Sequence, residues 1–495
     1  MKHFAIHTFG CQMNVHDSRR IEEVLRHEGM TPTEDVSSAD LVIINTCSVR
    51  HKAEHKLMSM LGTLRPLKAR PGVVLAVAGC VAQQEGERLI ESAPFVDLVF
   101  GPDNIAELPQ LLKATQSSGA SVVHTEFDLE DPTFLNATPH EGEKELSAYV
   151  TVMKGCDERC TFCIVPYTRG SERYRSSDEI VAEIRGLVAG GVQEITLLGQ
   201  TVNSWFDPNA LHIKPRSKQD ESRSQFAELL TRIANEVPSL KRLRYTSPHP
   251  RHVNDALVDA HRSLDMLARH VHLPVQSGSD AVLKRMSRRY TSAEYIERAR
   301  NLQHARPDLT LSTDIIVGFP GETDEDFEQT MRLVEEVGFV AAYCFKYSPR
   351  PYTPALQLGD DVPESIKDDR LQRLFELVEW QQSAHLKSLL APSNMCWSKA
   401  KSWRCWIGLW GRTERNEIVH LDVSAGVDPV GREITVQVTH AFAHSLLAEA
   451  IGVRRGEGAE KLGLRVVGNL VHQHLAGPMG VAIGYMASDL LRFVV

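Results

Sequence analysis

Short apolar runs alternate with amphipathic segments along the first part of the chain. The apolar runs are residues 3–10, 41–46 and 73–79. The second and third have the continuous apolar character of strands buried in a parallel sheet. Residues 17–28 and 50–61, which lie between the runs, have a helical pattern. Because strand and helix alternate, this region predicts a doubly wound parallel sheet of the α/β class.

Each of these three predicted strands ends at a cysteine. The cysteines are Cys11, Cys47 and Cys80, which we call the assembled triplet. The carboxyl ends of parallel strands share one edge of a sheet, so we expect the three thiols to meet there. Gly10 and Gly79 would let the backbone approach a bulky metal cluster closely. A free cysteine is often only a small buried hydrophobic residue, but three at the same topological position favour a metal centre.

Strand and helix alternate again from residue 146 to about 385. The predicted strands are residues 148–153, 194–198, 242–246, 270–274, 311–317 and 341–347, and the helical patterns cover 177–189, 225–236, 292–303 and 324–337. Six such units are too few for a closed eight-fold barrel. Residues 101–145 are weakly patterned and contain linker-like stretches, so we place a domain boundary near residue 144.

The last third of the chain changes character. A predicted helix over 368–390 leads into two β-rich segments, 411–420 and 431–441. These changes of pattern divide the chain into four parts: residues 1–144, 145–385, 386–447 and a tail of unknown role, 448–495.

The composition is that of an ordinary globular protein. The chain has 495 residues, of which 42% are hydrophobic and 24% are charged. No apolar run approaches the roughly 20 residues that span a bilayer, and the first residues lack the layout of a signal peptide. We therefore expect a cytoplasmic protein with no membrane segment. A net charge of −9 argues against indiscriminate nucleic-acid binding but permits a local basic face.

A second group of three cysteines lies within one short stretch. Cys156, Cys160 and Cys163, the local triplet, directly follow the predicted strand 148–153. Gaps this short put three thiolates on one loop. A structural zinc site takes four ligands, whereas three cysteines can hold an iron–sulfur cluster and leave one iron open. A zinc knuckle or a chance cluster is the alternative interpretation.

The local spacing, with Phe162 before the last cysteine, resembles the radical S-adenosylmethionine (SAM) superfamily. Residues 8–14, 45–50 and 78–80 are similar to the N-terminal domain of its methylthiotransferase family. The resemblance implies an open (β/α)6 half-barrel in the centre, SAM as cofactor and two 4Fe–4S clusters. In this family the local triplet is catalytic and holds the cluster that cleaves SAM. The assembled triplet holds an auxiliary cluster thought to carry the sulfur.

Polar residues follow several of the central strands. In any single loop they would be read as turn formers, but several such loops on one rim predict a pocket that faces the local triplet. The resemblance implies that these loops line the SAM site. The candidate cofactor-binding residues are Phe162, Gly199, Gln200, Asn203, Ser247, Gln276 and Ser277.

Several basic residues are candidates for RNA contact. Arg169 could pair with a carboxylate or a phosphate. The basic run 284–290 could grip an RNA backbone with Tyr290 stacked on a base, or be a solvated helix face. The β-rich C-terminal segments resemble TRAM, an RNA-binding β-barrel module. Its candidate phosphate contacts are Arg412, Arg415 and Arg432.

Three regions depart from the family pattern. Residues 391–410 hold four of the six tryptophans and put the first strand of the module in doubt. A compensated reading-frame change or an aromatic RNA-stacking surface would account for them. Residues 451–495 lie outside the resemblance, and Tyr352 stands where the family usually has glycine. Four histidines (249, 252, 270 and 272) lie around two separate strands without metal-site spacing, so we do not expect a metal there.

The resemblance implies addition of a methylthio group to C2 of N6-(dimethylallyl)adenosine at position 37 of tRNA. C2 carries an unactivated aromatic C–H bond, which requires radical chemistry. The implied partners are the tRNA anticodon loop and an electron donor such as flavodoxin or ferredoxin. We expect the protein to be a monomer. The alternatives are a methylthiotransferase for threonylcarbamoyladenosine or a ribosomal-protein aspartate, and a non-catalytic, metal-containing RNA-binding protein.

Overall fold

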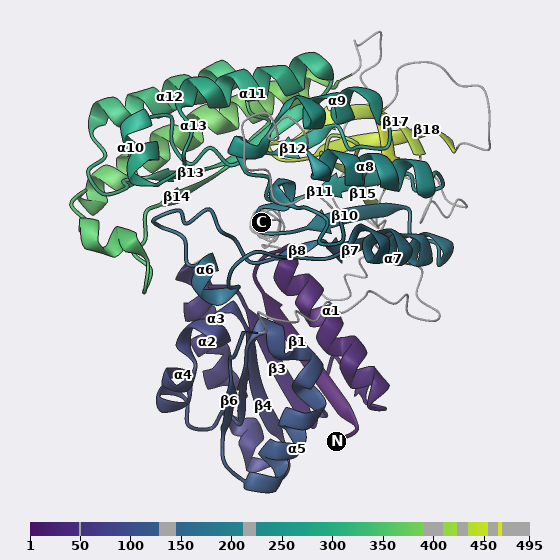
Figure 1. The fold of residues 1–495 in the computed structure, drawn as a ribbon, viewed down its shortest axis with the longest axis vertical. Coiled ribbons are helices and arrows are strands. Elements are labelled where there is room, and N and C mark those ends of the chain that lie inside the picture. The colour runs from purple at the N-terminus through teal and green to yellow at the C-terminus, as the bar shows by residue number, and fades with distance from the viewer. Residues whose placement is uncertain are drawn as a thin grey trace, which may run out of the picture.

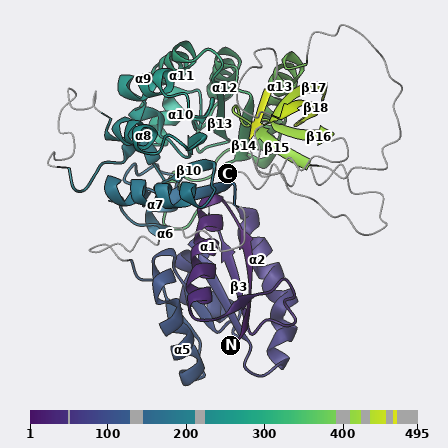
Figure 2. The ribbon, with the colours of Figure 1, turned by 90° about the vertical axis from the view of Figure 1, so that its right-hand side faces the viewer.

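The computed structural model describes most of the chain, in three units seen in Figure 1. The N-terminal unit lies below the central unit, and the strands of the C-terminal unit lie beside the central one (Figures 1 and 2). The described residues are 1–48, 51–127, 145–210, 224–390, 409–422, 434–453 and 464–467.

The N-terminal unit is a six-stranded, wholly parallel sheet, as the alternating pattern predicted. Its strand order is β2-β1-β3-β4-β5-β6. The strands are β1 (His3–Phe9), β2 (Thr31–Pro32), β3 (Leu41–Thr46), β4 (Val74–Gly79), β5 (Leu98–Phe100) and β6 (Val122–His124). Helices α1 (Gln12–His27) and α5 (Leu108–Ser118) pack on one face. Helices α2 (His51–Leu64), α3 (Cys80–Glu85) and α4 (Glu87–Ser92) pack on the other.

The interpretation of residues 101–145 as weakly patterned and linker-like was wrong for the first half of this stretch. This stretch contains the short helix η2 (Pro102–Glu107), α5 and the edge strand β6. Leu108, Leu111 and Leu112 are buried against the sheet. The strand was missed because three residues are too few for an alternating pattern to be visible.

The register of the first sheet aligns the ends of its central strands. Phe9 pairs with Thr46, and Thr46 pairs with Gly79. Strands β1, β3 and β4 therefore end side by side, and the chain that leaves each of them starts from the same edge.

The central unit has the six predicted strands, in two parallel three-stranded sheets. The strands are β7 (Ser147–Thr151), β10 (Glu194–Leu198), β11 (Arg242–Tyr245), β12 (His270–His272), β13 (Thr310–Val317) and β14 (Ala341–Lys346). The orders are β11-β10-β7 and β12-β13-β14, and an isolated parallel bridge between Leu243 and Leu267 links the sheets. The result is the open six-unit half-barrel that the resemblance implied.

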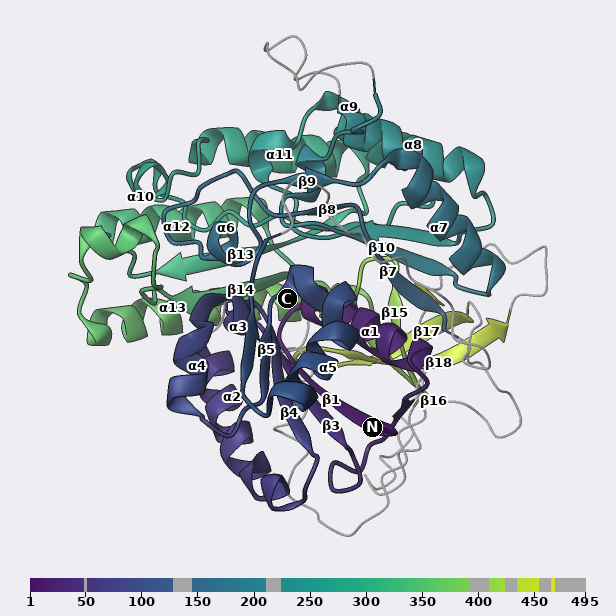
Figure 3. The same cartoon turned by 60° about the horizontal axis from the view of Figure 1, so that its bottom comes forward.

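Helices cover the outside of this half-barrel (Figures 1 and 3). They are α7 (Ser177–Ala189), α8 (Gln225–Glu236), α9 (Asp255–Ser263), α10 (Asp280–Arg285), α11 (Ser292–Ala305), α12 (Asp324–Val337) and α13 (Glu364–Ser388). Among the described helices, none is long and apolar enough to cross a membrane. Two short elements follow β7: the antiparallel pair β8 (Met153–Lys154) and β9 (Arg173–Tyr174), and the short helix α6 (Val165–Thr168).

The C-terminal strands close into a small barrel of order β15-β16-β18-β17-β19. The strands are β15 (Leu409–Thr413), β16 (Ile418–Asp422), β17 (Ile434–Ala441), β18 (Leu446–Val453) and β19 (Leu464–Val467). The barrel continues past residue 447, the limit we expected for this module, because β18 and β19 complete it. Residues 391–408, with their tryptophans, lie outside the described residues.

The barrel is held against the central unit by the turn between β15 and β16. The side chains of Arg242 and Arg244 donate hydrogen bonds to the Thr413 carbonyl at 3.4 and 3.0 Å. The Arg269 backbone N–H donates to the Glu414 carbonyl at 3.0 Å. These contacts fix the barrel beside β11 and the start of β12.

Candidate active site

The assembled triplet lies where the register brings three strand ends together. Cys11 is the N-cap residue of α1 after β1, Cys47 follows β3, and Cys80 opens α3 after β4. The Cys47 backbone N–H donates to the Phe9 carbonyl at 2.9 Å, which holds two of the three ends together. A side-chain hydrogen bond with Cys47 outweighs burial and lowers the pKa of Cys11 to about 6. Burial raises the pKa of Cys80. The structure thus confirms that these distant thiols converge on one edge.

An amide pair supports the assembled triplet. The Asn14 side chain donates to Asn45 Oδ1 at 3.2 Å, and the Asn45 side chain donates to the Asn14 carbonyl at 2.8 Å. Gly79 has φ +89°, and a Cβ there would lie 2.3 Å from Asn45 Oδ1. We expected Gly79 to let the backbone approach a metal cluster. In the structure the missing side chain instead makes room for this amide pair, which links α1 to β3.

The local triplet lies on the loop that follows β8. The Cys156 backbone N–H donates to the Gly170 carbonyl at 3.2 Å, and the Cys156 thiol lies 3.0 Å from Thr201 Oγ1. Gly155 has φ +79°, and a Cβ there would meet the Ser171 carbonyl oxygen at 2.0 Å. Burial raises the pKa of Cys156 to about 11 and also raises that of Cys163. This loop is therefore fixed by close backbone contacts.

Two later segments clamp the same loop. The Ala355 backbone N–H donates to the Thr161 carbonyl at 2.9 Å, and the Thr161 N–H donates to the Met286 carbonyl at 3.1 Å. Phe162 packs edge-on against Phe319, with 6.5 Å between ring centroids. Phe162, predicted to contact the cofactor, is thus part of an apolar support under the loop.

One buried arginine lies against each triplet. Arg169 Nε donates to Cys80 Sγ at 3.2 Å, and its Nη2 donates to Asp17 at 2.5 Å. Arg288 Nη1 donates to Cys160 Sγ at 3.4 Å. Hydrogen bonds to cysteine sulfur stabilise the thiolate that a metal cluster needs. Neither arginine was assigned this role from the sequence, because its partner lies far away along the chain.

These positions correct two expectations about RNA contact. Arg169 pairs with a carboxylate, as one of its two predicted partners, but it is 4% exposed and is not presented to an RNA phosphate. Tyr290 is buried, and its hydroxyl donates to the Val275 carbonyl at 2.8 Å, so it does not stack on a base. Of the basic run 284–290, the buried residue Arg288 serves the local triplet instead.

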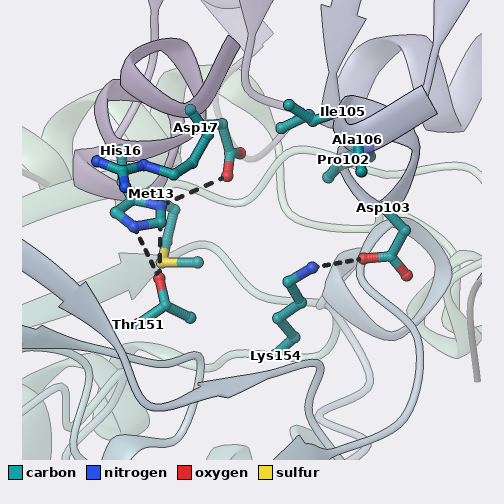
Figure 4. Close-up of a pocket in the computed structure, with 10 residues that line it drawn as sticks. Met13, His16, Asp17, Pro102, Asp103, Ile105, Ala106, Thr151 and Lys154 are labelled. Atoms are coloured by element: carbon teal, nitrogen blue, oxygen red, sulfur yellow. Dashed lines mark hydrogen bonds and ion pairs between the residues drawn. The ribbon is translucent and has the colours of Figure 1, made fainter. Parts of the chain in front are cut away.

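Further polar contacts join the N-terminal and central units beside the assembled triplet (Figure 4). His16 lies 3.3 Å from Thr151 Oγ1, and Lys154 lies 3.3 Å from Asp103. Arg173 also pairs with Asp103. Together with the ion pair of Asp17 and Arg169, these contacts fix the assembled triplet relative to the local one.

The other predicted cofactor-binding residues differ in burial and in hydrogen bonding. Asn203 donates to the His249 carbonyl at 3.0 Å and accepts from the His249 N–H at 2.8 Å, so it joins two loops. Ser277 is fully buried and bonds to Thr330, and Gly199 packs closely on Met153. Gln200 has a buried side-chain oxygen with no hydrogen-bond partner among the described residues, and Ser247 is exposed. Gln276 has φ +74°, and its N–H donates to the Asp314 carbonyl.

The candidate RNA contacts of the barrel are engaged within the protein. Arg412 donates to the Asn416 carbonyl and side chain at 3.2 and 3.0 Å, and burial lowers its pKa. Arg415 pairs with Glu417 at 3.3 Å. Arg432 lies outside the described residues.

The structure brings together one group that the sequence did not predict. Glu158, His249 and His252 place a ligand atom each within 4.8 Å of one another, next to the local triplet. His252 Nε2 lies 2.7 Å from Glu158. However, the Arg251 backbone N–H donates to His249 Nδ1 at 3.3 Å, so in the neutral ring Nε2 carries the proton. Burial lowers the pKa of His249, so the ring is neutral, and its one lone pair, on Nδ1, accepts from the Arg251 N–H and is not offered to a metal. The spacing His-x-x-His was the signal for this group.

The triplets suit a cluster better than a single metal ion. Each triplet supplies three free cysteine thiols, whereas a structural zinc site takes four ligands. Three thiolates can each bind a different iron of a cluster and leave one iron open. The donor sets therefore fit iron–sulfur clusters.

Comparisons with known proteins define the class first. The model of the radical SAM superfamily matches residues 150–334, and a model described as "Uncharacterized protein family UPF0004" matches residues 3–101. The structure of the radical SAM methyltransferase TsrM from Kitasatospora setae matches with a TM-score of 0.50 and 15% identity. It covers 71% of this chain and 74% of that one, and supports the fold alone.

Full-length relatives narrow the class. The tRNA-2-methylthio-N(6)-dimethylallyladenosine synthase of Sorangium cellulosum is 55% identical over 464 residues, which is 91% of this chain and 93% of that protein. The synthase of the same name from Myxococcus xanthus is 42% identical over 466 residues, 93% of this chain and 97% of that protein. The chain belongs to this family of radical SAM methylthiotransferases. It is a transferase, and its family uses SAM and two 4Fe–4S clusters.

Proposed function

We propose that this chain transfers a methylthio group to C2 of N6-(dimethylallyl)adenosine at position 37 of tRNA. The observation that carries the proposal is the 55% identity over nearly the full length with a synthase whose name states this product. The convergence of two cysteine triplets on neighbouring edges supports it, because the reaction needs both a radical and a sulfur donor.

In this proposal the local triplet, Cys156, Cys160 and Cys163, holds the catalytic cluster, and Cys11, Cys47 and Cys80 hold the second cluster. When bound, the two clusters would supply the electron transfer and the sulfur, and SAM would supply the radical and the methyl group. The chain's own residues keep the thiols in place: Arg288 donates to Cys160, and Arg169 donates to Cys80. The apolar support of Phe162 and Phe319 keeps water from one side of the loop.

The partners follow from the same proposal. The substrate is the anticodon loop of tRNA, whose single-stranded bases reach a pocket more easily than paired ones do. A flavodoxin or ferredoxin supplies the electron, and the enzyme acts as a monomer in the cytoplasm. The closed C-terminal barrel is proposed as a TRAM-like RNA-binding module, since small β-barrels commonly bind RNA.

The test is mass spectrometry of tRNA nucleosides from a strain that lacks its own enzyme of this type and expresses this chain. We expect the 2-methylthio derivative of N6-(dimethylallyl)adenosine to reappear. Methylthiolated threonylcarbamoyladenosine, or a methylthiolated aspartate in a ribosomal protein, would assign one of the alternative substrates instead. Unchanged nucleosides together with zinc in the purified protein would favour the non-catalytic alternative.

A further inference from the structure

Two exposed aromatic rings from distant parts of the chain lie together near the local triplet. Tyr167 is 41% exposed and Tyr352 is 50% exposed. Their ring centroids are 6.0 Å apart, and the ring planes are inclined by 34°. Exposed tyrosines so close together present one broad aromatic surface to solvent.

This surface borders both cysteine triplets. Tyr167 lies on α6, which begins two residues after Cys163 and packs against α3, the helix that Cys80 opens (Figure 1). Tyr352 lies on the loop whose Ala355 N–H is bonded to Thr161, within the local triplet's loop. A molecule that contacted both rings would therefore lie close to the loop of the local triplet and to α3, which Cys80 opens.

The backbone of Tyr352 is in a conformation that tyrosine rarely adopts. Its φ is +66°, in the left-handed region where glycine is unstrained and a bulky side chain is not. Packing of the ring in the core does not offset this strain, because half of the residue is exposed. Strained residues of this kind cluster at ligand-binding positions. The turn would form more easily with glycine, so the turn does not account for the tyrosine ring at this position.

We propose that Tyr167 and Tyr352 form a stacking surface for a base of single-stranded RNA next to the modified adenosine. The inference rests on the proposed function and adds a contact that positions the anticodon loop of the RNA. Every base has a flat π face, so aromatic side chains hold single strands without reading their sequence. Each ring offers a π face and no cationic group, which suits a base and not a phosphate.

The experiment uses the full-length, cluster-loaded enzyme under anaerobic conditions. The probe is an anticodon stem-loop RNA with 2-aminopurine beside the target adenosine, since stacking quenches its fluorescence. The decisive variant is Y352G, which removes the ring and also relieves the backbone strain. Y352F keeps a ring of the same size, and W380A removes a ring that is 68% exposed on α13, outside this surface.

We expect Y352G to bind the RNA roughly five- to a hundredfold more weakly and to lose the quenching, because one base–aromatic contact has that effect. Its thermal midpoint should be equal to or above that of the unmodified protein, which excludes general unfolding. The slope of affinity against salt should not change, because no phosphate contact is lost. Y352F and W380A should bind as the unmodified enzyme does.

Unchanged RNA affinity and quenching in Y352G would overturn the stacking surface while leaving the proposed function intact, provided that the unmodified enzyme still methylthiolates tRNA. A changed salt slope would assign Tyr352 to phosphate contact and would also overturn it. If the unmodified enzyme neither binds the stem-loop nor modifies tRNA, the proposed function fails and this inference fails with it.

Discussion

The local triplet lies within residues 156–163, whereas the assembled triplet spans residues 11–80, and the two depend on different parts of the fold. The first is shaped by one loop, with Gly155 pressed against Ser171. The second exists only when β1, β3 and β4 are paired in the observed register. In both triplets, nevertheless, one sulfur accepts a hydrogen bond from a buried arginine. Local spacing and long-range register can therefore build equivalent sites, but they are open to different kinds of damage.

Removal of one thiol from each triplet has the largest expected effect on this comparison. C160A and C47A should each lower the iron content from about eight to about four per chain, as each cluster holds four irons. Both variants should lose the methylthio product, but only C160A should also lose SAM cleavage, measured as 5′-deoxyadenosine. C344A is the control, because Cys344 is buried in β14 outside both triplets. Loss of SAM cleavage in C47A would show that the triplets do not work independently.

Glycine substitutions separate the loop from the register. In G79A the new Cβ meets Asn45 and the Thr46 carbonyl, and in G155A it meets the Ser171 carbonyl. Each clash, added to a strained φ, should destabilise its surroundings by about 2–4 kcal/mol. We expect G79A to lose iron from the assembled triplet alone and G155A from the local triplet alone, by iron counting and electron paramagnetic resonance. Equal losses at both sites in either variant would contradict separate construction.

The ion pair of Asp17 and Arg169 tests the link between the two triplets. Burial alone would raise the pKa of Asp17, but Arg169 outweighs it and lowers this pKa to about 2, from an ordinary 3.8. The carboxylate therefore stabilises the fold above pH 3.8, and this stabilisation is lost as the pH falls toward 2. D17N should destabilise the iron-free protein by about 3 kcal/mol near neutral pH. The difference in thermal midpoint should shrink across that acid range.

An exposed glycine away from both triplets gives the smallest expected effect. Gly186 lies within α7, and a Cβ there would meet no other atom of the described part of the chain within 4 Å. G186A should therefore stabilise the protein by about 0.5–1 kcal/mol, since alanine favours a helix. Both clusters should load as before. A loss of iron in G186A would mean that any glycine change disturbs the sites, and would weaken the interpretation of G79A and G155A.

The parts of the fold that could be predicted were those with long, regular patterns. Helices α7, α8 and α12 have the predicted bounds, because each combines a helical period with a capping serine or threonine. The strands β5 and β6 have three residues each and show no period. The convergence of Cys11, Cys47 and Cys80 was predictable because topology alone places strand ends together.

The contacts around the sites could not be predicted in the same way. Arg169 reaches Asp17 and Cys80 across a boundary between two units, and nothing in the local sequence names such partners. Tyr290 looked like a stacking residue beside basic neighbours, yet burial makes it a core residue. The group of Glu158, His249 and His252 arises because two loops of different strands meet. Side-chain pairing between distant loops depends on packing that a pattern does not contain.

The register of Phe9, Thr46 and Gly79 also limits how this gene can change in length. A residue added between Thr46 and Cys47, or the deletion of Thr46, would turn the thiol to the opposite side of the strand end, because successive side chains alternate. The same change in the surface loops beyond the helices would leave every cysteine in place. Insertions and deletions should therefore be tolerated between these strands and excluded at their ends.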